Sequence, residues 1–208
     1  MKYKSIFISD VHLGTKGCKA NQLLNFLDEI ECKNLFLVGD IIDGWKLRIR
    51  NHWPEEHSKV VRKIIKISNT TTVRYIIGNH DDFIRPFIKN AFSFGNIHLH
   101  NEYVYKSFNK KYLITHGDLY DRARIIPRQV INAAAQVLPE SVDGIRGFLT
   151  TEKVIKRKFA NKYDGVICGH THDPKVESFF MNCGDWKKKC TYITEDYSGH
   201  MQLNYYKK

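Results

Sequence analysis

Residues 77–82 read IGNHDD, so an amide, an imidazole and two carboxylates follow one glycine at the end of an apolar run. Gly and Asn accept a positive φ and Asp caps helices, and a simple turn is therefore one interpretation. The same side chains are also ligands for metal ions. Other segments that end in the same way would favour the second interpretation.

Four other segments do end in this way. They are SDVHLG with Asp10 and His12, GDIID with Asp40, THGD with His116, and GHTH with His170 and His172. Asp10 and His12, like His170 and His172, are two residues apart, and side chains at this spacing project to the same side of an extended chain. Functional groups gather at the carboxyl ends of strands in parallel α/β sheets, so these side chains are expected to converge.

The elements that must position these residues alternate in the first half of the chain. Apolar, β-branched runs predict strands at 4–9, 34–38 and 72–77, and helical spacing predicts helices at 18–32 and 55–68. This alternation indicates an α/β fold with a largely parallel sheet. The second half predicts shorter strands, with a mostly helical, Arg- and Lys-rich segment at 119–163 between them. The strands are expected at 103–108, 111–116, 166–170, 176–183, 190–196 and 201–206.

The collected side chains predict a metal centre. Three supply oxygen (Asp10, Asp40, Asn79), four supply imidazole (His12, His116, His170, His172), and His80 stands beside them. One ion cannot use so many ligands, whereas two ions about 3.5–4 Å apart, bridged by a carboxylate, would use them all. Nitrogen and oxygen ligands without thiolate suit Mn, Fe, Zn or Co. Glycines 39, 78, 117 and 169 would let the backbone turn sharply and approach these groups.

Composition narrows the class of protein. A chain of 208 residues predicts one domain, 1–208, with 119–163 as an insertion. Five scattered cysteines without a CxxC pair favour reduced thiols, and the N-terminus lacks the features of a signal peptide, so a cytoplasmic protein is expected. No apolar run approaches the roughly 20 residues that span a bilayer. The net charge of +11 favours phosphates, nucleic acid or anionic lipid as partners, although a solvated lysine-rich surface gives the same count.

The motifs D-x-H, GDxxD, GNHD, H-G-D and GHxH, in this order over residues 5 to 185, resemble the calcineurin-like metallophosphoesterase superfamily. The resemblance implies a four-layer αββα sandwich of two mixed sheets and a centre of two divalent ions, for which Mn²⁺ is preferred. It places Asp10, His12 and His172 on one ion and Asn79, His116 and His170 on the other, with Asp40 bridging both. The catalytic residues it implies are His80, Asp40 and Asn79.

The implied chemistry is hydrolysis of a phosphoester or pyrophosphate by metal hydroxide, because two cations lower the pKa of bound water and clamp the phosphoryl oxygens. His80 would stabilise the transition state or protonate the leaving group, and Asp81 or Asp82 could orient its ring. Asp43 and Asp118 are expected to support loops or to hydrogen-bond a ligand imidazole.

Within the superfamily, GDIIDGWK, GNHDDF, THGDLYD and NCGDW (182–186) resemble the UDP-2,3-diacylglucosamine hydrolases of lipid A biosynthesis, which release UMP. Many of those enzymes carry Arg at the position of His80, and 119–163 is short for their helical lid. The likeness implies a helical cap at 119–163 and peripheral contact with the inner membrane. Phosphate could meet Arg122, Arg124 and Arg128, and acyl chains could meet Ile125, Ile126, Val130, Val137 and Leu138.

Several alternatives stay open. The apolar stripe of the insertion could simply pack on the domain, and the basic residues Lys153, Lys156, Arg157 and Lys158 could face either solvent or an anionic membrane. Trp45, Trp53 and Trp186 are expected to pack loops rather than stack on substrate. The charge and His80 would also suit a phosphodiesterase or nuclease acting on nucleic acid or cyclic nucleotides. A non-catalytic binding scaffold is the third hypothesis.

Overall fold

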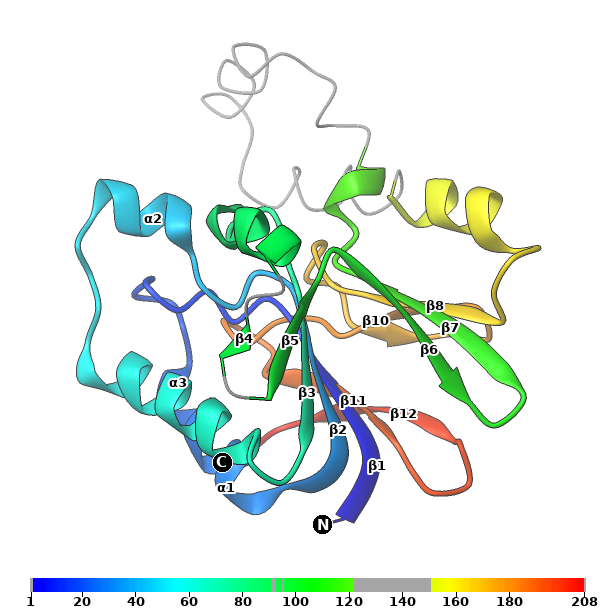
Figure 1. Cartoon of the computed structure of the whole chain (residues 1–208), viewed down its shortest axis with the longest axis horizontal. Helices are drawn as coiled ribbons and strands as arrows, with labels where there is room; N and C mark the ends of the chain where they lie inside the picture. The colour runs from blue at the N-terminus through cyan, green and yellow to red at the C-terminus, as the bar shows by residue number, and fades with distance from the viewer. Residues whose placement is uncertain (1, 91–92, 95, 122–150, 208) are drawn as a thin grey trace.

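The computed structural model describes residues 2–90, 93–94, 96–121 and 151–207, whose strands form two mixed sheets (Figure 1). The larger sheet has the order β12-β11-β1-β2-β3-β5-β4. Its strands are β1 (Lys2–Ile8), β2 (Glu31–Val38), β3 (Thr72–Ile76), β4 (Ser93–Phe94), β5 (Ile97–His100), β11 (Thr191–Glu195) and β12 (Met201–Tyr205). β1, β2, β3 and β5 are parallel, β11 and β4 flank them antiparallel, and β12 pairs antiparallel with β11.

The smaller sheet has the order β6-β7-β8-β10-β9. Its strands are β6 (Glu102–Ser107), β7 (Lys110–Thr115), β8 (Gly165–Cys168), β9 (Lys175–Val176) and β10 (Phe180–Asn182). β7, β8 and β10 run parallel, while β6 and β9 are antiparallel edges. Both sheets therefore have a parallel centre, whose carboxyl ends can gather functional side chains.

Three apolar layers hold four layers of structure together. Helices α1 (Ala20–Glu29) and α3 (Glu55–Ile67) cover the outer face of the larger sheet through a core that includes Phe26 and Ile64. Phe7 lies in the core between the two sheets. Residues 151–159 form a helix that packs Ile155 and Phe159 on the outer face of the smaller sheet. The predicted αββα architecture with two mixed sheets is confirmed.

The predicted strands and helices of the first half are present, with ends that differ by a few residues, but the short elements were missed. They are α2 (Gly44–Ile49), the 3₁₀ helix η1 (Asp82–Asn90), and strands β4 and β5. The sequence also did not predict the 3₁₀ helix η2 (Asp118–Tyr120) as a separate element at the start of the insertion. Such elements are too short for hydrophobic periodicity to reveal them. The single strand expected at 176–183 is wrong, because β9 and β10 are separate there.

The segment 119–163, predicted to form a cap, is only partly described. Residues 122–150 lie outside the described residues, and with them Arg122, Arg124 and Arg128. In the helix of residues 151–159, Lys156 pairs with Glu152 at 2.6 Å and Glu177 at 2.9 Å, so part of its basic charge is neutralised. All five cysteines are free thiols, as expected. No helix in the described part of the chain has the length and apolar character needed to cross a membrane.

Candidate metal centre

The carboxyl ends of both sheets meet at one place. In the larger sheet β1, β2 and β3 are adjacent and parallel, and the chain beyond them carries Asp10, Asp40 and Asn79. In the smaller sheet β7 and β8 are adjacent and parallel, and they lead to His116 and His170. The sheet topology therefore brings together residues that lie up to 160 positions apart.

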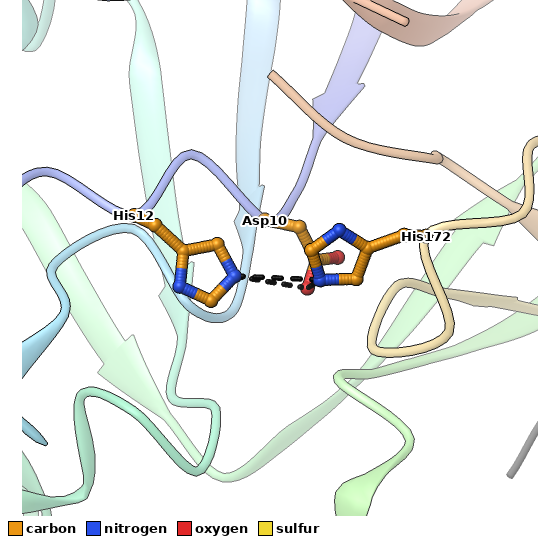
Figure 2. Close-up of side chains that lie close together, drawn as sticks. All are labelled: Asp10, His12 and His172. Atoms are coloured by element: carbon orange, nitrogen blue, oxygen red, sulfur yellow. Dashed lines mark hydrogen bonds and ion pairs between the residues drawn. The ribbon is translucent and has the colours of Figure 1, made fainter. Parts of the chain in front are cut away.

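The first group of donors consists of Asp10, His12 and His172 (Figure 2). Oδ1 of Asp10 lies 3.2 Å from Nε2 of His172 and 3.8 Å from Nε2 of His12, and the two imidazole nitrogens are 3.4 Å apart. The other carboxylate oxygen of Asp10 accepts hydrogen bonds from the Ser9 hydroxyl and from the His170 backbone N–H. One oxygen is thus anchored while the other faces two imidazoles.

The second group surrounds Asp40. Its Oδ1 accepts the backbone N–H of His80 at 2.8 Å, which orients the carboxylate. Its Oδ2 lies 3.2 Å from Nε2 of His116 and 3.9 Å from Nε2 of both His12 and His80. One oxygen among three imidazole nitrogens is the arrangement expected for a bridging carboxylate. Asp10 and Asp40 also share a three-donor group with His116, which links the two halves of the site.

Neighbouring acceptors fix the orientation of the imidazoles. Nδ1 of His12 lies 3.0 Å from Oδ2 of Asp43, and Nδ1 of His116 lies 2.9 Å from the carbonyl oxygen of Val38. When each Nδ1 donates, Nε2 is left as the lone-pair nitrogen that points into the site. This acceptor–histidine arrangement is typical of metal centres. The prediction that Asp43 hydrogen-bonds one of these imidazoles is confirmed.

Three buried atoms of the predicted ligands lack a hydrogen-bond partner: Oδ1 of Asp10, Oδ1 of Asn79 and Nε2 of His116. Leaving a buried polar atom unsatisfied costs about 1–3 kcal/mol, so such atoms are rare without a reason. All three are lone-pair donors on residues predicted to be ligands. A pair of divalent cations would satisfy them, and the residues therefore fit the predicted dinuclear centre.

His170 is placed differently from the other candidates. Its Nε2 lies 2.9 Å from Oδ2 of Asp121, and its ring centroid is 5.2 Å from that of His116. No close three-donor group of His, Cys, Asp or Glu in the described part of the chain includes it. Asp121 directly follows the THGDLY run and was not predicted. Its only signal in the sequence was its place in the THGDLYD motif.

Backbone strain is concentrated at the candidate ligands. Asp10, His12, Asp40, His170 and His172 all have positive φ, between 54° and 70°. This left-handed conformation is uncommon outside Gly and Asn, and it clusters at functional sites. These sharp turns after the strands direct the side chains that follow each strand toward the centre.

Glycine makes two of the close approaches possible. A Cβ at position 78 would collide with Oδ1 of Asp40, and one at position 169 would collide with the Ser9 hydroxyl and Oδ2 of Asp10. Gly78 and Gly169 thus let neighbouring strand ends approach the two central carboxylates, as the sequence predicted.

Carboxylates and imidazoles of the site shift one another's pKa values. Burial raises the pKa of Asp40, but the imidazoles of His116 and His12 together outweigh burial, so the pKa falls to about 2. Burial lowers the pKa of His12, but the carboxylates of Asp10 and Asp43 more than reverse this and raise it to about 9. In the metal-free protein, protons on the imidazoles therefore take the place of cations beside these carboxylates.

His80 is held by residues other than those expected. Asp43, not Asp81 or Asp82, lies 3.0 Å from its Nδ1, and the Trp45 ring packs against the imidazole at a centroid distance of 4.2 Å. Asp81 instead accepts hydrogen bonds from three donors on neighbouring segments, Ile41 N, Gly78 N and Tyr75 OH. The prediction that Asp81 or Asp82 orients His80 is wrong, because Asp81 turns inward to tie loops together.

The three tryptophans differ in exposure. Trp186 and Trp53 pack as expected, since Trp186 is fully buried and Trp53 donates to the Ser58 hydroxyl at 2.9 Å. Trp45 is 38% exposed beside His80. Of the three, it is the one whose ring borders the candidate centre.

The NCGDW segment anchors the loops of the centre. Trp186 donates its backbone N–H to the Asp10 carbonyl at 3.1 Å. The Asn182 amide donates to Gly169 O at 2.7 Å and to the Thr171 hydroxyl at 3.0 Å. This segment therefore supports the loops of the D-x-H and GHxH motifs through hydrogen bonds. None of its residues belongs to the candidate metal-binding groups of the described part of the chain.

Comparison with known protein families shows to which family the chain belongs. The model of the calcineurin-like phosphoesterase family matches residues 3–174. The chain belongs to this family. Membership implies a hydrolase with a dinuclear divalent metal site, in agreement with the donor groups described above. No curated protein matches the chain.

Several solved structures resemble this chain. A dimetal phosphatase from Danio rerio is 11% identical, with 98% of this chain and 95% of that chain covered and a TM-score of 0.49. A Vps29 single mutant from Entamoeba histolytica is 14% identical, with 98% and 99% covered and a TM-score of 0.47. A Pseudomonas putida nuclease is 20% identical over 54% and 53%, with a TM-score of 0.32. Likenesses this distant transfer no activity.

Proposed function

We propose that this phosphoesterase hydrolyses a lipid-linked nucleotide pyrophosphate of the UDP-2,3-diacylglucosamine type and releases UMP. The observation that carries the hydrolytic part is Oδ2 of Asp40 among the Nε2 atoms of His12, His80 and His116, at 3.2 to 3.9 Å. The motif NCGDW and the net charge of +11 support the choice of an anionic, lipid-linked substrate. One domain, 1–208, with a cap at 119–163 belongs to the same proposal.

The proposed metal ligands fall into two sets. Asp10, His12 and His172 would hold one divalent ion, and Asn79, His116 and His170 the other, with Asp40 shared between them. Mn²⁺ is the proposed metal, because oxygen and imidazole ligands suit it. Bound ions of this kind lower the pKa of water and neutralise charge on phosphoryl oxygens.

His80 is the proposed acid. Its Nε2 faces Asp40 Oδ2 at 3.9 Å, and Asp43 at 3.0 Å from Nδ1 keeps the ring oriented. Trp45 against the imidazole restricts its rotation. A ring held in this way can donate a proton from Nε2 to the bridging oxygen that leaves with the sugar phosphate when UMP is released. We propose that Arg122, Arg124 and Arg128 bind substrate phosphate, and that the protein works in the cytoplasm, peripherally at the inner membrane.

The test incubates Mn²⁺-loaded protein with UDP-2,3-diacylglucosamine and follows UMP release. Asp40→Asn removes the bridging charge with little change in size, and Asp28→Asn is the matched control, because Asp28 pairs with Lys63 on the helices far from the donors. The proposal expects UMP release by the wild type and by Asp28→Asn, and none by Asp40→Asn. Metal content is measured for all three proteins. UMP release unaffected by Asp40→Asn would overturn the proposal.

A phosphodiesterase or nuclease is the second candidate, favoured by the net charge of +11 and by His80. Cleavage of bis-p-nitrophenyl phosphate without UMP release would keep the metal centre and reject the lipid-linked substrate. Metal-dependent cleavage of single-stranded DNA, with affinity that falls steeply as salt rises, would then support the nuclease. A non-catalytic scaffold, the third hypothesis, predicts no turnover, so cleavage of a generic phosphodiester that His80→Ala abolishes would exclude it.

A further inference from the structure

An apolar cavity of about 340 Å³ lies between α3, η1 and the larger sheet. Every side chain that lines it is aliphatic or aromatic. Its one polar group, the Tyr75 hydroxyl, already donates to Oδ2 of Asp81 at 2.6 Å. The cavity therefore offers no hydrogen bond to a ligand, and only hydrocarbon would gain by entering it.

The size of the cavity separates it from ordinary packing defects. Protein interiors are close-packed, with few voids larger than a water molecule. A cavity of about 150 Å³ lined by similar residues stays dry and binds benzene, and this one is more than twice as large. It is also open, because Ile65, Phe83 and Phe87 in its wall are 41%, 38% and 45% exposed. A flexible chain could enter by this mouth.

The cavity adjoins the candidate metal centre. Ile41 and Ile42 in its wall are the two residues between Asp40 and Asp43. Phe83, at the start of η1, packs on Gly44, whose backbone N–H donates to the carbonyl of His80 at 2.9 Å. Residues of the GDxxD and GNHD motifs therefore separate the apolar space from the charged one.

We propose that this cavity binds one acyl chain of the substrate while the phosphate group lies at the metal centre. The proposal rests on the proposed function, since it assumes a phosphate-bearing lipid. It assigns the chain to the α3 and η1 side of the domain, in addition to any contact made by the cap. The chemistry required is a saturated hydrocarbon chain, which a free fatty acid also carries.

The test measures the binding of n-alkyl phosphates from ethyl to decyl to the Mn²⁺-loaded protein by calorimetry. Each buried methylene is expected to tighten binding about fourfold until the cavity is full. Decanoate, which has the chain without the phosphate, is expected to bind more weakly than decyl phosphate. Decanoate that binds as tightly would assign the cavity to free fatty acid and overturn the proposal.

Two variants locate the effect. Val61→Trp would place an indole in the cavity, and Ile65→Trp would block its mouth, so each is expected to abolish the dependence on chain length. Lys59→Trp, on the exposed side of the same helix, should retain it. Equal binding of all chain lengths to the wild type overturns the proposal. Absence of UMP release from UDP-2,3-diacylglucosamine by the wild type is a separate result, which refutes the proposed function and leaves the binding series to decide on the cavity.

Discussion

Arg85 links two of the loops that carry candidate ligands, and its removal should loosen both. Its guanidinium donates to Ile77 O at 3.3 Å, Gly78 O at 3.2 Å and Oδ2 of Asp118 at 3.2 Å, and it also donates to Asn101 Oδ1 at 2.7 Å. The first two acceptors precede Asn79 and the third follows His116. Asp118 is only 1% exposed, so the charge of Arg85 compensates a buried carboxylate.

The expected cost of Arg85→Ala follows from this geometry. Breaking a buried ion pair costs about 3–5 kcal/mol, but the Arg85 side chain is 25% exposed, so solvent reduces the effect. We expect the free energy of unfolding to fall by about 3 kcal/mol, which corresponds to a drop in Tm of about 6–12 °C. Arg85→Lys should recover less than half, because an ammonium cannot reproduce the planar fork of donors.

The assay is urea denaturation of the metal-free protein, followed by calorimetric titration with Mn²⁺. Arg62→Ala is the matched control, since Arg62 pairs with Glu55 on the surface and such pairs contribute about 0–1 kcal/mol. Arg85→Ala should also weaken the binding of one ion more than the other, because Arg85 contacts the loops of Asn79 and His116, which we propose to hold the same ion. A loss below about 1 kcal/mol with normal binding of both ions would refute this reasoning.

Three further predictions follow from the site. Gly78→Ala should cost about 2 kcal/mol or more and abolish metal binding, because the new Cβ collides with the Asp40 carboxylate; differential scanning fluorimetry and metal analysis would show both. Because the pKa of His12 is raised to about 9, the metal-free protein should lose stability as pH rises from about 6.5 through 9 while its affinity for Mn²⁺ increases; a stability that rises with pH would contradict this. Trp45→Ala should lower kcat with little change in metal content, because Trp45 packs against His80, the proposed acid, and not against one of the seven proposed metal ligands; unchanged kcat would exclude the positioning role.

The order of the longer elements could be read from the sequence, as could five residues that the structure brings together in donor groups: Asp10, His12, Asp40, His116 and His172. Asp10 and His12 follow a β-branched run, and glycines stand where only a missing Cβ lets two segments approach closely. These local patterns indicated where the strands end and which family the chain resembles. The long strands and helices have enough periodic positions to be recognised. Short elements such as α2 and η1 do not, because their few buried residues are set by contacts with distant segments.

The partners of the imidazoles were decided by the tertiary structure. Asp81 stands next to His80 in the chain, yet the strand-end turn directs it inward to Tyr75, and Asp43 from another loop lies beside His80 instead. The apolar cavity next to the site likewise depends on how η1 lies over the sheet. Hydrogen bonds and voids between loops depend on angles between elements, and local sequence carries little information about those angles. The residue types determine which ligands and proton donors the chain can offer, while packing determines which of their atoms lie close enough to interact.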